Sequence, residues 1–262
     1  MEVSDAAEPL AKEVTARGKR QIREGLLFEF GNHEGERKLQ DFMELGAAPF
    51  SVVAFHNKFL SQVRQSFVMG SYYPALTGAC ALGERILNHL LLKLRGFYST
   101  SPEDKKVYNK DSFDDWDVPI SVLSSWGVLL PEAAKGFAQL KEIRHRTLHF
   151  HPEVDKNDRS LALEAIKKLS EIIEAQFGAF GRQPWFAMGF GGAAFIRKSH
   201  ESDPFVKLVY LPNCALVGPF HRLECLHGKW IAHDDYPYES KEVTDDEFVA
   251  MFNDRASHPR AL

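Results

Sequence analysis

Between Val52 and Phe177 the apolar residues recur every three or four positions, the spacing of one buried face of an α-helix. The clearest stripe predicts a helix over residues 74–94, and Gly96 stands where such a helix would end. Three more stripes predict helices through Val52, Phe55, Phe59, Val63 and Phe67; Ala134, Phe137, Leu140 and Ile143; and Leu163, Ile166, Leu169, Ile173 and Phe177. Short connections favour antiparallel packing, so the pattern predicts an antiparallel helical bundle over residues 47–183.

The remaining segments before residue 183 carry weaker patterns. Phe97–Asp117 is charged and predicts a loop, whereas Pro119–Trp126 predicts a short helix. Residues 1–46 are polar and mixed, and form a partly helical N-terminal segment in this interpretation. A helix is expected over Glu8–Arg23 and a short extended piece at Leu26–Phe30.

After Gly181 the helical spacing gives way to short runs rich in β-branched and aromatic residues, separated by Gly, Pro and Asn. Thr244 and Glu247 fit a capping box, which predicts a last helix over Asp245–Phe252. The predicted fold class is therefore mainly α: a helical bundle followed by a small α+β appendage, residues 184–262, built on an antiparallel sheet. Its predicted strands are Trp185–Phe190, Ala194–Arg197, Phe205–Leu211, Ala215–Leu223 and Lys229–His233.

Composition limits the partners that this chain can have. The formal net charge is −4 over 262 residues, so any surface that binds RNA would have to be a local basic patch. No apolar run reaches membrane-spanning length, and the N-terminus lacks the apolar stretch of a secretory signal. Three cysteines without close pairing are best explained as reduced thiols, so the sequence predicts a cytoplasmic protein without a membrane partner.

The segment richest in chemistry lies where the helix from Pro131 is expected to end. It crowds two arginines and three histidines into eight residues: Arg144, His145, Arg146, His149 and His151. A helix C-terminus favours cations, an arginine offers a planar fork of donors to a phosphate, and a histidine exchanges a proton near neutral pH. These are the groups that RNA cleavage needs when no metal takes part.

Helical geometry restricts how this segment can work. Arg144 and His149 are separated by ~140° around an ideal helix, so they would not converge on an unbroken one. Pro152 biases the residue before it away from helical geometry, so the helix is expected to end or bend around His149–His151. Either that break brings the two residues together, or a second chain completes the site.

The run Arg144-His145-Arg146-Thr147-Leu148-His149 resembles the R-x(4–6)-H motif of the HEPN superfamily, in which a polar residue usually follows the arginine. The bundle and the long early helix around Glu84 are similar to that superfamily as well. The resemblance implies a metal-independent endoribonuclease of toxin–antitoxin or defence systems that needs no cofactor. It implies a homodimer with RNA as substrate and with an antitoxin or regulator as a further partner.

The resemblance also assigns roles to residues. Arg144 and His149 would be the catalytic pair, with His145 an accessory polar residue and Glu84 a supporting carboxylate. Arg146 and His151 are the residues expected to contact RNA beside them. Unpaired RNA is the expected substrate because its flexible backbone can align the 2′-hydroxyl.

Several alternatives stay open at this point. Arg144 and His149 also fit a cationic helix end paired with Glu142 or Glu153, in a non-catalytic binding or dimerisation module. A zinc site is a further alternative, and two sets of residues are candidate ligands: His145, His149 and His151, or His221, Cys225, His227 and His233. The Gly-rich residues 189–194 favour a turn over a phosphate loop, and the basic residues of 93–110 favour a solvated loop over an RNA groove.

Overall fold

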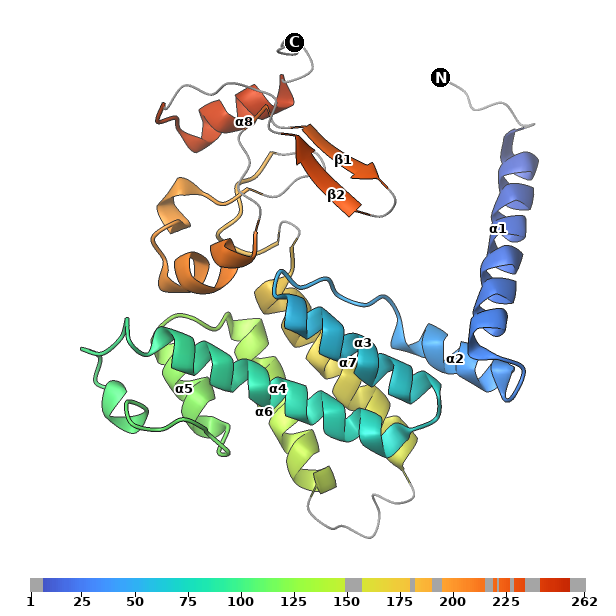
Figure 1. Ribbon diagram of the computed structural model, residues 1–262, viewed down its shortest axis with the longest axis horizontal. Helices are drawn as coiled ribbons and strands as arrows, with labels where there is room; N and C mark the ends of the chain where they lie inside the picture. Colours follow the sequence, from blue (N-terminus) through green and yellow to red (C-terminus); the bar gives the residue numbers. More distant parts are fainter. Residues whose placement is uncertain are drawn as a thin grey trace.

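The computed structural model shows a helical bundle with a long helix on one side and a smaller C-terminal part above it (Figure 1). The residues that the structure describes are 7–148, 157–179, 182–189, 195–214, 219–220, 222–226, 229–233 and 241–254. Within these ranges no helix is both long enough and apolar enough to pass through a membrane.

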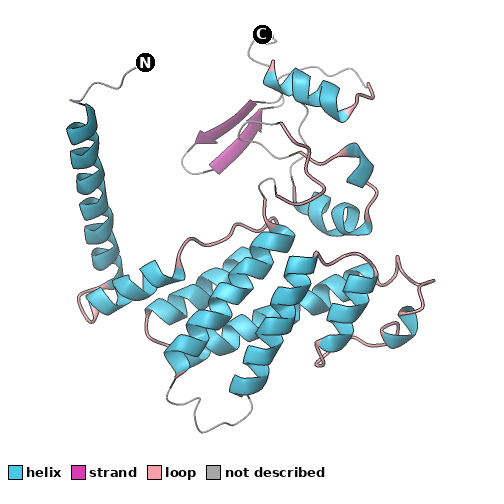
Figure 2. Cartoon of the chain, turned by 180° about the vertical axis from the view of Figure 1, so that it is seen from behind, coloured by secondary structure: helices cyan, strands magenta, loops and turns pink. Residues whose placement is uncertain are grey.

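The predicted bundle helices are all present. They are α3 (Ala54–Val68), α4 (Tyr72–Leu94), α5 (Asp117–Ser125), α6 (Pro131–Leu148) and α7 (Asp158–Phe177). The connector after α4 is loop and turn, apart from the 3-10 turn η1 (Asp104–Lys106). Helices α3, α4, α6 and α7 lie side by side, and α5 covers one end of α4 and α6 (Figures 1 and 2). The prediction of a mainly helical, bundle-like chain is confirmed.

The apolar stripes that predicted these helices form a single core. Side chains from every bundle helix are inaccessible to solvent, among them Phe67, Leu76, Leu87, Leu123, Leu140, Ile166 and Ile173. Burial of such side chains contributes about 1.5–3 kcal/mol each, which makes this core the main source of the bundle's stability.

Two glycines let the central helices approach closely. A Cβ atom on Gly83 of α4 would lie 2.7 Å from Leu140 Cδ2 of α6 and 2.9 Å from the Trp116 ring. A Cβ atom on Gly136 of α6 would lie 2.6 Å from Ile172 Cγ1 of α7. Any larger residue would push these helices apart, so the two glycines set the spacing on both sides of α6.

The N-terminal region is more helical than predicted. Helix α1 (Ala7–Phe30) includes Leu26–Phe30, so the expected extended piece there is wrong. Helix α2 (Gly35–Leu45) was not predicted at all. Helix α1 projects from the molecule and packs on α2, which rests against the bundle (Figure 1).

The predicted fold class is wrong for the C-terminal part. Phe205–Leu211, expected as a strand, forms the π-helical turn η4 (Val206–Tyr210) followed by the 3-10 turn η5 (Leu211–Asn213). The described residues of Trp185–Phe190 and Ala194–Arg197 form one isolated bridge, Phe186 to Ile196, and the 3-10 turn η3 (Lys198–His200) follows. Among the described residues, only the hairpin of β1 (Arg222–Leu226) and β2 (Lys229–His233) forms a ladder.

Tertiary packing explains this correction. The rings of Phe205 and Tyr210 pack against each other and against the ring of Trp185. Phe205 also packs on Phe177, the last residue of α7, with their ring centroids 5.8 Å apart. The Tyr210 hydroxyl donates a 2.6 Å hydrogen bond to the Gly178 carbonyl. This contact requires a helical turn, and it overrides the strand preference of β-branched and aromatic residues.

The last helix follows the sequence closely. Helix α8 (Asp245–Asn253) begins with the predicted capping box, in which Glu247 N–H donates to Thr244 Oγ1 at 3.2 Å. The Glu247 carboxylate accepts from Thr244 N–H at 2.8 Å and from the Thr244 hydroxyl at 3.1 Å, and these two bonds lower the pKa of that carboxyl group.

Candidate functional site

Helix packing brings Glu84 of α4 to Arg144 of α6. Arg144 Nη2 lies 3.1 Å from Glu84 Oε2, and both side chains are about one-third exposed, at 30% and 28%. Gly83 precedes Glu84 and allows the close approach of α4 to α6. Two residues that the sequence singled out, one as catalytic and one as supporting, therefore form an ion pair at the surface of the bundle.

Trp116 contacts both members of this ion pair from the buried side. Its indole Nε1–H donates to the same Glu84 oxygen at 3.1 Å, and Arg144 Cζ lies 5.7 Å from the centre of its ring. Trp116 itself is 1% exposed. A carboxylate that is fixed by a buried indole gives the guanidinium a defined position, and the ring face attracts the cation further.

Cys80 lies one helical turn before Glu84 on the buried side of the site. Burial raises the pKa of its thiol to about 12, with Arg144 lowering it and Glu84 raising it. The thiol is therefore protonated and unreactive, and it takes no part in chemistry at the Glu84–Arg144 pair.

The other cations near the end of α6 have partners on neighbouring helices. Lys141 Nζ binds both oxygens of Asp117 at 2.8 and 3.0 Å, and Arg146 Nη2 lies 3.7 Å from Glu164 on α7. Arg146 and Glu164 are more than half exposed, so this pair contributes little to stability. His145 is exposed on the last turns of α6.

The remaining predicted site residues follow directly on this helix. Helix α6 ends at Leu148, and both His149 and His151 lie outside the described residues, which resume at Asn157. The roles of these two histidines remain predictions.

The other motifs from the sequence are placed as follows. Arg95 donates to the carbonyls of Val107 and Lys110, so it fastens the loop after α4. Within the described ranges no three His, Cys, Asp or Glu side chains gather closely enough for a metal ion. The zinc alternatives and the Gly-rich turn involve residues outside those ranges, His149, His151, His221, His227 and residues 190–194.

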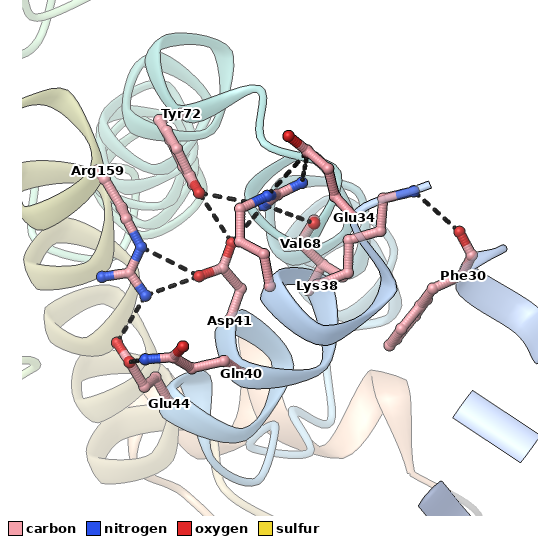
Figure 3. A network of polar contacts seen from close by, with 10 residues as sticks. Phe30, Glu34, Lys38, Gln40, Asp41, Glu44, Val68, Tyr72 and Arg159 are labelled. Atoms are coloured by element: carbon pink, nitrogen blue, oxygen red, sulfur yellow. Dashed lines mark hydrogen bonds and ion pairs between the residues drawn. The ribbon is translucent and has the colours of Figure 1, made fainter. Parts of the chain in front are cut away.

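Sequence reasoning missed a second polar site, which we call the Asp41 cluster: Arg37, Asp41, Tyr72 and Arg159. Asp41 on α2 has no solvent exposure, and its carboxylate accepts four hydrogen bonds. Two come from Arg159 of α7, at 3.0 and 2.7 Å, one from Tyr72 of α4 and one from Arg37 (Figure 3). The cluster fastens α2 to the bundle.

The charges in the Asp41 cluster stabilise one another. The hydrogen bonds that Arg159 donates to Asp41 and then to Glu44 raise the pKa of Arg159, and the bond from Arg159 lowers the pKa of Glu44. Burial, and then the bond to Asp41, raises the pKa of the Tyr72 phenol. Arg159 is in the first turn of α7, so the cluster connects the start of this helix to α2 and α4. The i, i+4 spacing of Arg37 and Asp41 was the available signal.

No family model matches the sequence, and no curated protein or solved structure is similar enough to count as a match. Geometry and chemistry at the end of α6 are therefore the basis for the functional proposal.

Proposed function

We propose that this chain is a metal-independent endoribonuclease of HEPN type that acts as a toxin or defence effector. The observation that supports this proposal is the ion pair between Glu84 and Arg144 at 3.1 Å, directly before the segment that contains His149. It joins a carboxylate and an arginine from different helices, and the arginine is five positions before His149, the histidine that the resemblance assigns to catalysis.

In the proposed mechanism Arg144 binds the scissile phosphate. Glu84 engages Nη2 and fixes the plane of the guanidinium, and in this proposal Nη1 donates to an oxygen of the phosphate. The same cation stabilises the charge that develops on phosphorus in the transition state. Glu84 and Trp116 act as positioning residues because each holds the guanidinium without touching the RNA.

His149 carries out proton transfer in this proposal. RNA cleavage without a metal requires removal of the proton on the ribose 2′-hydroxyl and protonation of the leaving 5′-oxygen. A homodimer would place two His149 side chains across one cleft, which supplies both an acid and a base. His145, Arg146 and His151 would form the local basic patch that the net charge of −4 requires.

A second function is favoured by the same ion pair. Arg144 already has a carboxylate and an aromatic face from its own chain, and such a pair suits a non-catalytic module that binds or dimerises. In that case Glu84 and Arg144 only connect α4 to α6. The two functions differ in whether the wild-type protein cleaves RNA, and only the nuclease requires Glu84 for catalysis.

The test is cleavage of a fluorescent panel of unpaired RNAs by purified protein in excess EDTA. Wild type is compared with Arg144→Ala, His149→Ala and Glu84→Gln, and Lys135→Gln, at an exposed lysine of α6 outside the proposed site, is the matched control. The nuclease proposal expects cleavage by wild type and the control, none with Arg144→Ala or His149→Ala, and a lower kcat with Glu84→Gln. Absence of wild-type cleavage across the panel would favour the binding module, and cleavage that survives both alanine variants would refute the assigned residues.

A further inference from the structure

A cavity separate from the Glu84–Arg144 pair lies where the C-terminal part meets the bundle. Its volume is about 100 Å³, and α3, α4, α7 and the turns η4 and η5 line it. A single water needs ~10–15 Å³ on this measure, so the space admits a small organic molecule. We call it the junction cavity.

The polar lining of the junction cavity is basic because of Lys93, whereas its two histidines have lowered pKa values. His89 and Lys93 of α4 and His56 of α3 line it, Asn213 adds a neutral amide, and no carboxylate is among the lining residues that the structure describes. Burial, and then the charges of Arg85 and Lys93, lower the pKa of His89. An anion in the cavity would offset this crowding of positive charge.

His56 contributes a neutral hydrogen-bond donor. Its Nδ1 lies 2.9 Å from Ser51 Oγ, and that oxygen accepts a bond from Val53 N–H at 3.1 Å. In the tautomer in which the Ser51 hydroxyl donates to Nδ1, the ring proton of neutral His56 is on Nε2. Burial keeps the ring neutral by lowering its pKa to about 3. An Nε2–H donor suits a carboxylate oxygen.

The rest of the lining is apolar and aromatic. Phe55 lies against His89, with ring centroids 5.0 Å apart, and Phe177 lies against His56 at 4.5 Å. Val53 and Val209 complete this side. A ligand with an apolar body would gain binding free energy by burying that surface here, in addition to the interaction of its charge. Inorganic anions have no such apolar surface.

We propose that the junction cavity binds a small organic carboxylate with a short apolar or aromatic body. The carboxylate would contact Lys93, His89 and the His56 donor, and the body would pack on Phe55 and Phe177. Glu84 and Lys93 differ by about 180° around α4, so this site and the Arg144 site occupy opposite faces of one helix.

Binding is tested by two-dimensional NMR titration of the full chain with butyrate, benzoate, benzyl alcohol and inorganic phosphate. The proposal expects saturable shifts at Phe55, His89 and Phe177 with both carboxylates, and weaker binding of the alcohol and phosphate. Lys93→Met should weaken benzoate about tenfold, equivalent to about 1.4 kcal/mol. Lys135→Met, an exposed lysine on α6, is the matched control and should leave the Kd unchanged.

Each other outcome overturns a defined part of the proposal. Equal affinity for benzyl alcohol and benzoate would refute the role of the basic lining. Equal affinity for phosphate and benzoate would refute the apolar half and leave a general anion site. Absence of saturable shifts with either carboxylate would refute the site, and shifts that persist unchanged in both Lys93→Met and His89→Gln would place the ligand elsewhere.

Discussion

The Asp41 cluster yields the sharpest prediction about stability. In Asp41→Asn the side chain keeps its shape but loses its charge, while Arg37 and Arg159 keep theirs. Asp41 is fully buried, so the amide also directs N–H groups toward donors with which it cannot bond. The variant should therefore weaken the attachment of α2 to α4 and α7.

The expected loss follows from the exposure of the partners. Removal of one member of a buried ion pair costs about 3–5 kcal/mol. Arg37 and Arg159 are 29% and 36% exposed and retain Glu34 and Glu44 as partners, so water and these carboxylates recover part of the loss. We therefore expect the lower end of the range, about 3 kcal/mol.

Urea unfolding followed by circular dichroism measures this loss. With a slope of ~3 kcal/mol per molar urea, a loss of about 3 kcal/mol lowers the unfolding midpoint by ~1 M. Asp114→Asn, an exposed carboxylate in the loop after α4, is the control and should change stability by less than about 0.5 kcal/mol.

A double variant tests the cause. If the cost arises from the uncompensated arginine charge, Arg159→Gln should recover part of the stability lost in Asp41→Asn, so the two effects should not add. A cost below about 1 kcal/mol for Asp41→Asn, or strict additivity in the double variant, would refute the reasoning from buried charge.

Three further predictions concern the bundle interior. Gly83→Ala should cost about 1–3 kcal/mol in urea unfolding because its Cβ meets Leu140 and Trp116, whereas Gly18→Ala in α1, with open space around it, should not destabilise; equal effects would contradict the packing argument. Burial lowers the pKa of His56 to about 3 in the native state, whereas in the unfolded chain this histidine is protonated below pH about 6.5. The free energy of unfolding should therefore decrease as the pH is lowered from 6.5 towards 3, by at most ~1.4 kcal/mol per pH unit. His56→Gln should flatten the dependence of the urea midpoint on pH between 6.5 and 4, and parallel curves would argue against this assignment. Cys80 should resist iodoacetamide in the native protein at pH 8, as measured by peptide mass spectrometry, because burial raises its pKa to about 12; rapid labelling would show that the site opens.

The sequence predicted those parts of the fold that depend on apolar periodicity. Stripes such as Leu76 to Leu94 require one buried face whatever their neighbours are, so the bundle helices followed. Phe205–Leu211 failed because its composition favours a strand locally, while its contacts with Phe177 and Trp185 determine a helical turn. Helix α2 was missed because Asp41 and Lys38 are polar side chains that become buried only through distant partners.

The candidate site shows the same division. Glu84 and Arg144 were each singled out, yet their contact depends on Gly83 and Trp116, which no local pattern relates to them. The bond between Asp41 and Arg159 joins residues 118 positions apart, beyond the reach of periodicity or capping rules. His149 and His151 remain predictions from the motif.

The chain segments that precede the first bundle helix and follow the last one are hydrogen-bonded to each other. Val52 N–H donates to the Phe177 carbonyl at 3.0 Å, Ala179 N–H donates to the Phe50 carbonyl at 3.3 Å, and Ser51 and Gly178 form an antiparallel bridge. The chain thus enters and leaves the bundle at one point. A segment with adjacent ends can be inserted into a surface loop of another protein, or circularly permuted with new ends in the loop after α4, with little loop-closure entropy to overcome. The bundle segment is therefore suited to transfer into another protein as one unit.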